Sequence, residues 1–298
     1  EPSAGTPGIR TDQKEPRMRE KLEGLEKQLQ RMGGTRELRA DVSGMSPAMP
    51  EPLKGRGAQK KLDIRLLSSL PHGREGKSGL KPGAVQGLWL SPKALHEVSR
   101  TLYGRISWWL PPVIWPDEEP SWSRLVSMAV KNGARHFVCH SPWQSAFFPS
   151  VSGLSLTAGP FCNIANAIAI GLLRDMGFGG VIVSPELAEE DLLSLPGQSP
   201  LPMGAVLTGF WPAGITRHKA VGLKSQDAFQ SPKGEAFWMR RYGQNVWIYP
   251  AWPLDLSARR AALEKAGYAT VVNMEEHPPR SLAPATRSSE FNWSVGLL

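Results

Sequence analysis

One segment in the middle of the chain, at 154–187, most constrains the fold because it contains a complete strand–helix–strand unit. Asn163 or Asn166 can cap a helix, since Asn is a favoured residue at a helix N-terminus. The apolar positions of that helix are Ile164, Ile168, Leu172 and Leu173. Gly177 then stops the helix. The run at 181–183 is continuously apolar and β-branched, which is typical of a strand buried on both faces. The segment therefore predicts an α/β protein with a parallel sheet.

From residue 83 onward, strand and helix patterns alternate as they do in repeated βα units. Strands are expected at 85–90, 106–110, 136–139, 154–157, 181–183, 205–207, 246–249 and 270–273. Helices are expected at 93–102, 121–132, 165–176, 189–193, 234–241 and 257–266. Eight strands suit a closed (β/α)₈ barrel, although 83–298 is short for one. We expect a TIM-barrel-like domain over 83–298, either closed or a partial barrel that upstream sequence completes.

The first 82 residues have a different composition. They contain no Trp, Tyr or Phe, and 17 Lys and Arg stand against 11 Asp and Glu, which accounts for six of the net eight positive charges. Without aromatic side chains this segment has little with which to build a core. Apolar residues spaced four and three apart at 15–32 predict one short coiled-coil-like helix. We expect 1–82 to be a largely disordered basic segment, with a strand or connector at 62–70.

Charge and hydropathy indicate where such a protein works and what it contacts. A basic tail can bind RNA through charge alone, but interspersed acidic residues and the absence of aromatic residues favour a solvated linker. We find no run of 18 apolar residues and no signal-peptide pattern, so the sequence predicts a cytoplasmic protein without a membrane segment. Two cysteines, Cys139 and Cys162, agree with a reducing compartment.

The string Asn163-Ile-Ala-Asn166 is followed, after a helix and a strand, by Ser184-Pro-Glu186. This pattern resembles a motif of the U32 peptidase family, whose members are also called collagenase-like proteases. The matching segments lie at 159–187, 203–218 and 291–298. The resemblance covers about 83–298 and implies a barrel fold and a hydrolase that acts on peptides. Other members of the family modify RNA or assist quinone hydroxylation, so it also allows an RNA-modification factor.

The cysteine count departs from the family pattern. The resemblance implies an iron–sulfur cluster held by four cysteines, mostly in the loop after an Arg-Cys step. Here that step reads Thr216-Arg217-His218, and 219–235 contains no cysteine. A cubane cluster needs about four thiolates, and this chain has only Cys139 and Cys162. We therefore expect no iron–sulfur cluster, no other cofactor and no metal.

Two further patterns are better explained by packing than by a ligand. His136, Cys139 and His140 have zinc-ligand spacing, but on a strand Cys139 points away from both histidines. The segment at 106–115 is rich in Trp and could form a stacking platform for a sugar, base or proline. Large aromatic side chains more often build the core, so a core role is favoured.

The candidate site residues follow predicted strands, at the edge where parallel sheets bind their ligands. The candidate substrate-binding residues are Asn163, Asn166, Ser184, Arg217 and His218. Glu186 is a candidate general base, and Arg217 with His218 could bind a carboxylate or phosphate. Cys162 is a candidate nucleophile because it precedes a helix N-terminus that would lower its pKa. Each of these residues also suits a cap or a loop anchor, and no other catalytic residue can be named.

Three functions remain open on this reading. The first is a U32-type peptidase with a peptide substrate, for which the resemblance is the main support. The second is a non-catalytic scaffold or binding module that partners an upstream U32 half or another protein. The third is an RNA-modification factor, which the basic charge favours and the cysteine count weakens.

Overall fold

The structure is a computed structural model. The residues that it describes are 27, 48–53, 61–68, 85–148, 153–218, 228–280, 282 and 288–293. The chain divides into two units, Glu1–Pro47 and Ala48–Leu298, and the elements below belong to the second. Apart from Lys27, the helix expected at 15–32 lies outside the described residues.

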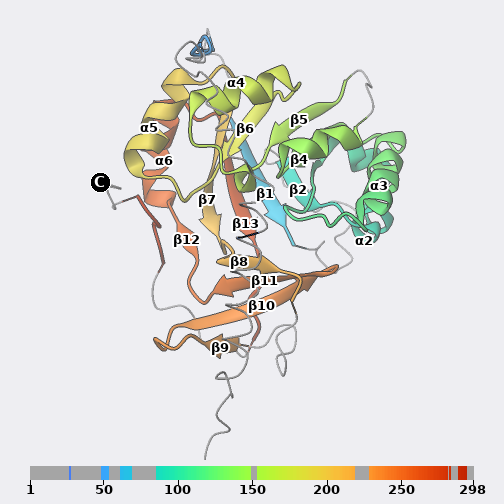
Figure 1. Cartoon of the computed structure of the whole chain (residues 1–298), viewed down its shortest axis with the longest axis vertical. Coiled ribbons are helices and arrows are strands. Elements are labelled where there is room, and N and C mark those ends of the chain that lie inside the picture. Colours follow the sequence, from blue (N-terminus) through green and yellow to red (C-terminus); the bar gives the residue numbers. More distant parts are fainter. Residues whose placement is uncertain are drawn as a thin grey trace, which may run out of the picture. The chain divides into compact units, whose positions relative to one another are not determined.

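In the described part of the second unit, eight parallel strands close into a barrel (Figure 1). In barrel order they are β1 (Leu62–Leu67), β2 (Val85–Trp89), β3 (Ser107–Trp109), β4 (His136–Cys139), β5 (Ser155–Ala158), β6 (Gly180–Val183), β7 (Met203–Gly209) and β13 (Thr270–Glu275). The pairing of β13 with β1, for example Leu62 beside Thr270, closes the ring. The expected TIM-barrel-like fold is confirmed, and the partial-barrel alternative is wrong because this chain supplies the whole ring.

Strand β1 comes from 62–70, the stretch for which the sequence left strand and connector open. It lies before residue 83, where we expected the barrel to begin, and it pairs with both β2 and β13. Buried and partly exposed residues alternate along part of β1, and Ile64 and Leu66 lie buried among the core side chains. The barrel sheet therefore includes a segment of the chain that composition assigned to the N-terminal region.

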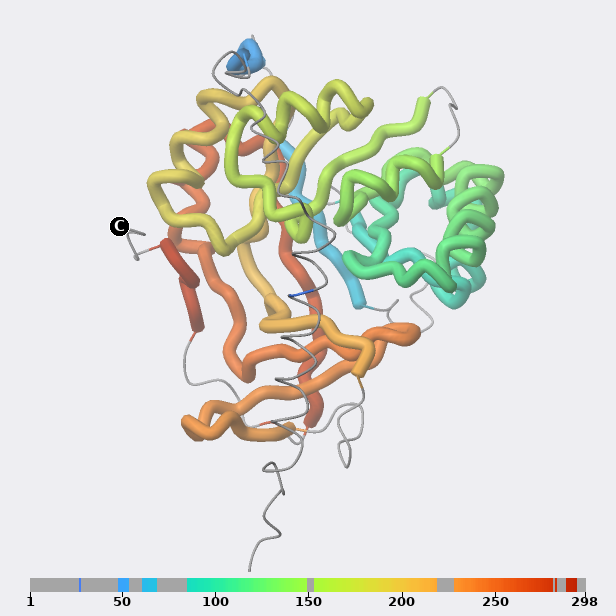
Figure 2. Tube along the Cα trace, in the orientation of Figure 1, coloured from blue at the N-terminus to red at the C-terminus, as the bar shows by residue number. Residues whose placement is uncertain are grey.

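The described helices of the second unit lie on the outside of the barrel, as the tube trace in Figure 2 shows. They are α2 (Pro92–Glu97), α3 (Glu119–Lys131), α4 (Ala167–Asp175), α5 (Glu189–Gln198) and α6 (Arg260–Ala266), with the 3₁₀ turns η4 (Arg100–Arg105), η5 (Pro142–Phe147), η6 (Pro160–Cys162) and η7 (Ser257–Arg259). In α4 the buried face consists of Ala167, Ile170, Gly171 and Leu173. The expected apolar face is therefore partly wrong, because Ile168 and Leu172 are exposed. None of the described helices is long and apolar enough to span a bilayer.

A four-stranded antiparallel sheet is inserted in sequence between β7 and β13, at the end of the barrel to which their arrowheads point (Figure 1). Its described strands, in spatial order, are β8 (Gly214–Thr216), β11 (Asn245–Pro250), β10 (Ala236–Tyr242) and β9 (Ala228–Gln230). A short strand, β12 (Leu254–Asp255), then runs antiparallel to β7. The insertion places this sheet at the carboxyl ends of the barrel strands.

The helix expected at 234–241 is wrong, because most of these residues belong to strand β10. Strand β10 forms a hairpin with β11 in which Trp238 lies beside Tyr249, and the two rings stack at 4.4 Å. Gly243 turns the hairpin with φ of 58°, a left-handed conformation that Gly adopts at little cost. Cross-strand pairing thus overrides the helical spacing of these residues. The strand expected at 246–249 is present as β11, but it belongs to the inserted sheet.

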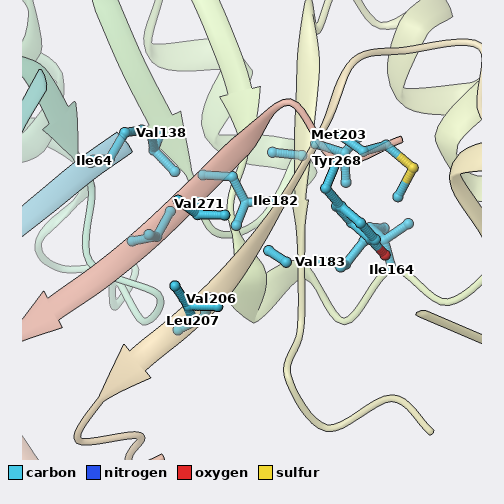
Figure 3. Close-up of a cluster of buried hydrophobic side chains, with 14 of the residues drawn as sticks. Ile64, Val138, Ile164, Ile182, Val183, Met203, Val206, Leu207, Tyr268 and Val271 are labelled. Carbon is cyan, nitrogen blue, oxygen red and sulfur yellow. The ribbon is translucent and has the colours of Figure 1, made fainter. Parts of the chain in front are cut away.

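Among the described residues, buried apolar side chains form three clusters, and Figure 3 shows part of the largest. Ile64, Val138 and Ile182 contribute to it from three barrel strands, and burying each such side chain contributes roughly 1.5–3 kcal/mol. Two bulkier rings, those of Trp109 and His140, also lie in the interior, and both are fully buried or nearly so. Gly87 of β2 lies against the Trp109 ring, and Gly159, which follows β5, lies against the His140 ring, so the absence of a side chain at each leaves room for the rings.

Candidate functional site

A cavity of about 480 Å³ lies where the carboxyl ends of β1 and β2 meet the hairpin of β10 and β11. Four aromatic rings line it, those of Trp89, Trp122, Tyr242 and Trp247. Its volume is in the range of small-ligand and peptide sites, and the carboxyl ends of the strands are where TIM-barrel enzymes place their chemistry. This cavity, called the mouth cavity below, is the candidate site.

Polar groups are placed around the aromatic walls. Glu118 lines the mouth cavity, and its Oε2 accepts a hydrogen bond of 3.1 Å from the backbone N–H of Trp115. No described cationic side chain forms an ion pair with Glu118. Asn245 is buried, accepts from the Trp115 indole at 2.8 Å and donates to the Val113 carbonyl at 2.9 Å. Asn245 is therefore a fixed part of the wall, whereas one oxygen of Glu118 has no partner among the described residues.

A buried ionic cluster holds the hairpin against the last barrel strand. Glu276 follows β13 directly, and its two oxygens accept from Arg240 Nη1 and from the Tyr242 hydroxyl, each at 2.6 Å. Burial raises the pKa of the Glu276 carboxyl, and the hydrogen bond from Tyr242 and the charge of Arg240 oppose that rise. Because the Tyr242 ring lines the mouth cavity, this cluster fixes one wall of the site.

Behind the mouth cavity, the His140 ring is enclosed by aromatic side chains. Its centroid lies 5.5 Å from that of Trp89, 5.3 Å from Trp109 and 5.0 Å from Phe161. Neither ring nitrogen has a partner among the described residues. Burial lowers the pKa of His140 to about 3, so the ring is neutral at pH 7. His140 therefore supports the wall formed by Trp89 and does not itself reach the cavity.

The zinc-like spacing of His136, Cys139 and His140 does not produce a metal site. His136 is exposed at the start of β4, whereas Cys139 and His140 are buried near its end. Among the residues that the structure describes, no group of three or more His, Cys, Asp or Glu is arranged to hold a metal ion.

The structure brings Ser184 and Glu186 together after β6. The buried Ser184 hydroxyl accepts from the Glu186 backbone N–H at 3.2 Å. The exposed Glu186 carboxylate accepts from the Trp211 indole at 2.7 Å, and the Glu186 carbonyl accepts from the Asn292 amide at 2.6 Å. Neither Ser184 nor Glu186 is among the residues that line the mouth cavity. The pair anchors the loop after β6 to Trp211 and Asn292.

The pKa of the Cys162 thiol is raised, whereas we expected a helix N-terminus to lower it. Its Sγ donates to the Cys139 carbonyl at 3.4 Å, and burial raises the pKa of Cys162 to about 12. It lies in η6, a turn of three residues that is too short to supply a helix dipole. Of the two asparagines, Asn166 caps α4 by accepting from Ala169 N at 2.9 Å, and Asn163 is exposed with a left-handed φ of 51°.

Arg217 and His218 follow β8 and lie on the surface of the inserted sheet. Arg217 forms an ion pair with Asp117 at 2.9 Å, donates to Gln244, and lies over the Trp115 ring at 5.2 Å. The His218 side chain is exposed. Among the described residues, no hydrogen bond or ion pair joins Arg217 to Glu186. The expected site residues therefore form separate groups rather than one constellation.

The sequence reading missed the residues that line the mouth cavity. Trp122 lies in the helix expected at 121–132, which carried no site residue, and Tyr242 and Asn245 follow the helix wrongly expected at 234–241. A hairpin signal was present, since Gly243 lies between two stretches rich in aromatic and β-branched residues.

No family model matches the chain, and no curated protein matches it. Among solved structures, it is similar to the U32 peptidase Mk0906, with 10% identity and a TM-score of 0.47, over 79% of this chain and 100% of that chain. It is also similar to the spore cortex-lytic enzyme SleL of Bacillus cereus, with 11% identity and a TM-score of 0.38, over 79% of this chain and 73% of that one. At these identities the likeness is one of fold.

Proposed function

We propose that this protein is a U32-type, peptide-acting hydrolase that holds an extended peptide in the mouth cavity. The observation that carries the proposal is the position and lining of that cavity. It lies at the carboxyl ends of the strands of a closed parallel barrel, and four aromatic rings and the Glu118 carboxylate line it. The sequence motifs that resemble U32 peptidases agree with this proposal.

The lining suits a peptide better than a strongly charged ligand. The rings of Trp89, Trp122 and Trp247 offer flat apolar faces on which proline and aromatic side chains pack. Of the charged side chains that line the mouth cavity, Lys93 and Glu97 form an ion pair of 3.7 Å, and the charges of Arg241 and Glu118 are opposite in sign. Recognition would therefore depend on apolar burial, with hydrogen bonds from the peptide backbone at the edges.

Hydrolysis of a peptide bond needs a base for the attacking water, and Glu118 is our candidate. In the proposed step, water oxygen bonds to the peptide carbonyl carbon while its proton moves to the Glu118 carboxylate. The carbon–nitrogen bond then breaks, and the amine leaves with that proton. A positioned general base typically contributes about 10²- to 10⁴-fold in rate.

The test is turnover of quenched fluorescent peptides and of denatured collagen by protein purified in chelator. We expect Glu118→Gln to lower kcat by about 10²-fold or more. The matched control is Glu119→Gln, which removes the neighbouring exposed carboxylate and should leave turnover unchanged. Trp122→Ala should raise KM, because it removes a wall of the mouth cavity. Equal activity in the Glu118 and Glu119 variants would refute the assignment of the base.

A second candidate, a peptide-binding module without turnover, is favoured by one observation. The two residues that the sequence offered for catalysis are engaged elsewhere, since the Cys162 thiol is buried and Glu186 binds Trp211. Calorimetric binding of the same peptides, lost in Trp122→Ala and with no cleavage, would select this candidate. An RNA partner would instead give an affinity that falls steeply with salt.

A further inference from the structure

A second cavity, of about 690 Å³, opens at the amino ends of the barrel strands, the end away from the mouth cavity. First residues of several strands line it, among them Leu62, Ser107 and Thr270. In most TIM barrels, layers of bulky branched side chains fill the interior. Here Gly180 and Gly204 line this end without a side chain that would fill it, and at Gly204 the Thr270 and Ile182 side chains already pack against the position of a Cβ. Part of the cavity thus follows from glycine in the sequence.

Three polar residues stand side by side on adjacent strands in this cavity. The register pairs Ser107 of β3 with His136 of β4, and His136 with Ser155 of β5. Side chains at paired positions of a parallel sheet point to the same face. All three residues line the cavity, as does Thr157, two positions further along β5. Hydroxyls on both sides of an imidazole form a row of hydrogen-bond donors.

Arg105 adds a fixed positive charge beside this row. It ends η4, two residues before Ser107, and it lines the same cavity. Among the described residues, Arg105 and His136 form no ion pair or hydrogen bond, and no described lining residue is Asp or Glu. Because no described carboxylate lines the cavity beside Arg105, its charge is left for an anionic ligand.

From this arrangement we infer that the amino end of the barrel is a binding site for a small oxyanion, with a phosphate monoester as the best match. The guanidinium group of Arg105 presents a planar fork that binds two oxygens of a phosphate or carboxylate. The Ser107, Ser155 and Thr157 hydroxyls donate to the remaining oxygens, and the cavity has room for the organic part. The site is separate from the mouth cavity and does not depend on the proposed hydrolase.

Isothermal titration calorimetry on the full chain tests the site with three probes: inorganic phosphate, glycerol 3-phosphate and citrate. We expect saturable binding that Arg105→Gln weakens about tenfold or more, since hydrogen bonds to charged groups are among the strongest in proteins. The matched control is Arg124→Gln on α3, an exposed arginine bonded to Ser121 and absent from the cavity lining. His136→Gln, at the exposed start of β4, is a second variant with the same expected direction.

The three probes also identify the source of the oxyanion. Tighter binding of glycerol 3-phosphate than of phosphate supports a phosphate monoester, whereas binding of citrate alone assigns the site to carboxylates. Binding should be unchanged in Trp122→Ala, which alters only the mouth cavity. The inference is overturned if none of the probes binds at millimolar concentration, or if Arg105→Gln and Arg124→Gln weaken binding equally, because that would reflect net charge alone.

Discussion

A single methyl group placed at Gly159 would test whether the barrel interior is built around the His140 ring. Gly159 has φ of −84° and ψ of 170°, a conformation that Ala adopts freely. A Cβ there would lie 2.2 Å from His140 Nδ1 and 2.8 Å from Val138 Cγ1. Ordinary contacts begin near 3.4 Å, so the His140 ring would have to move by about 1.2 Å, the difference between 3.4 and 2.2 Å.

The ring has little space for such a shift, because His140 is 2% exposed and aromatic rings surround it. Overpacking of a core typically lowers the free energy of unfolding by about 1–3 kcal/mol. Because the His140 ring is confined, we expect Gly159→Ala to cost about 3 kcal/mol, at the upper end of this range. Urea unfolding followed by Trp fluorescence measures the loss. The control is Gly214→Ala, where a Cβ would meet no atom within 4 Å, and its effect should stay within about 0.5 kcal/mol.

Removing the ring should rescue the variant. In the double variant Gly159→Ala with His140→Ala, the added methyl group no longer meets the His140 ring. The loss of stability in the double variant should therefore be smaller than the sum of the two single losses by about 1–3 kcal/mol. The reasoning fails if Gly159→Ala costs less than about 1 kcal/mol, or if the two effects simply add.

Three further predictions concern Glu276, Cys162 and the hydrogen bond between Trp211 and Glu186. Burial raises the pKa of Glu276 above 4.5, so the folded chain binds its proton more tightly than the unfolded chain does. The Glu276 contribution to stability is therefore greatest below pH 4.5 and declines as pH rises through the raised pKa. Urea titrations at about pH 4 and about pH 7 should show this decline relative to Glu276→Gln, and parallel curves would contradict it. Iodoacetamide at about pH 8 should leave Cys162 unmodified until the protein unfolds, because burial raises its pKa to about 12; mass spectrometry that finds rapid alkylation of the folded chain would show otherwise. Trp211→Phe removes the donor to Glu186 and should cost about 1 kcal/mol, and the same loss on a Glu186→Ala background would show that this bond contributes nothing.

Local patterns in the chain predicted much of the barrel. The runs at 85–90, 136–139 and 181–183 form β2, β4 and β6, and Gly177 ends α4 with φ of 91°. These features depend on side chains that are close in sequence. Continuous β-branched runs favour extended backbone, and glycine tolerates a left-handed turn wherever the fold places it.

The candidate site was predicted less well than the fold. Local sequence places a residue at the end of its own strand, but it does not say which other strand ends lie beside it. Whether Glu186 and Arg217 face one point depends on barrel order and on what covers the strand ends. Arg217, which follows strand β8 of the inserted sheet, forms an ion pair with Asp117 and donates a hydrogen bond to Gln244. Glu186, in the loop after β6, accepts a hydrogen bond from Trp211 instead.

The sequence by itself determined that this chain alternates buried strands with amphipathic helices, since hydrophobic periodicity and turn residues are encoded locally. Only the tertiary structure decided that 62–67 closes the ring, that 236–242 is a strand, and which rings line the mouth cavity. Leu62 meets Thr270 across more than two hundred residues, and β10 is extended because β11 lies beside it. Such pairings are stabilised by partners that no local window of sequence contains.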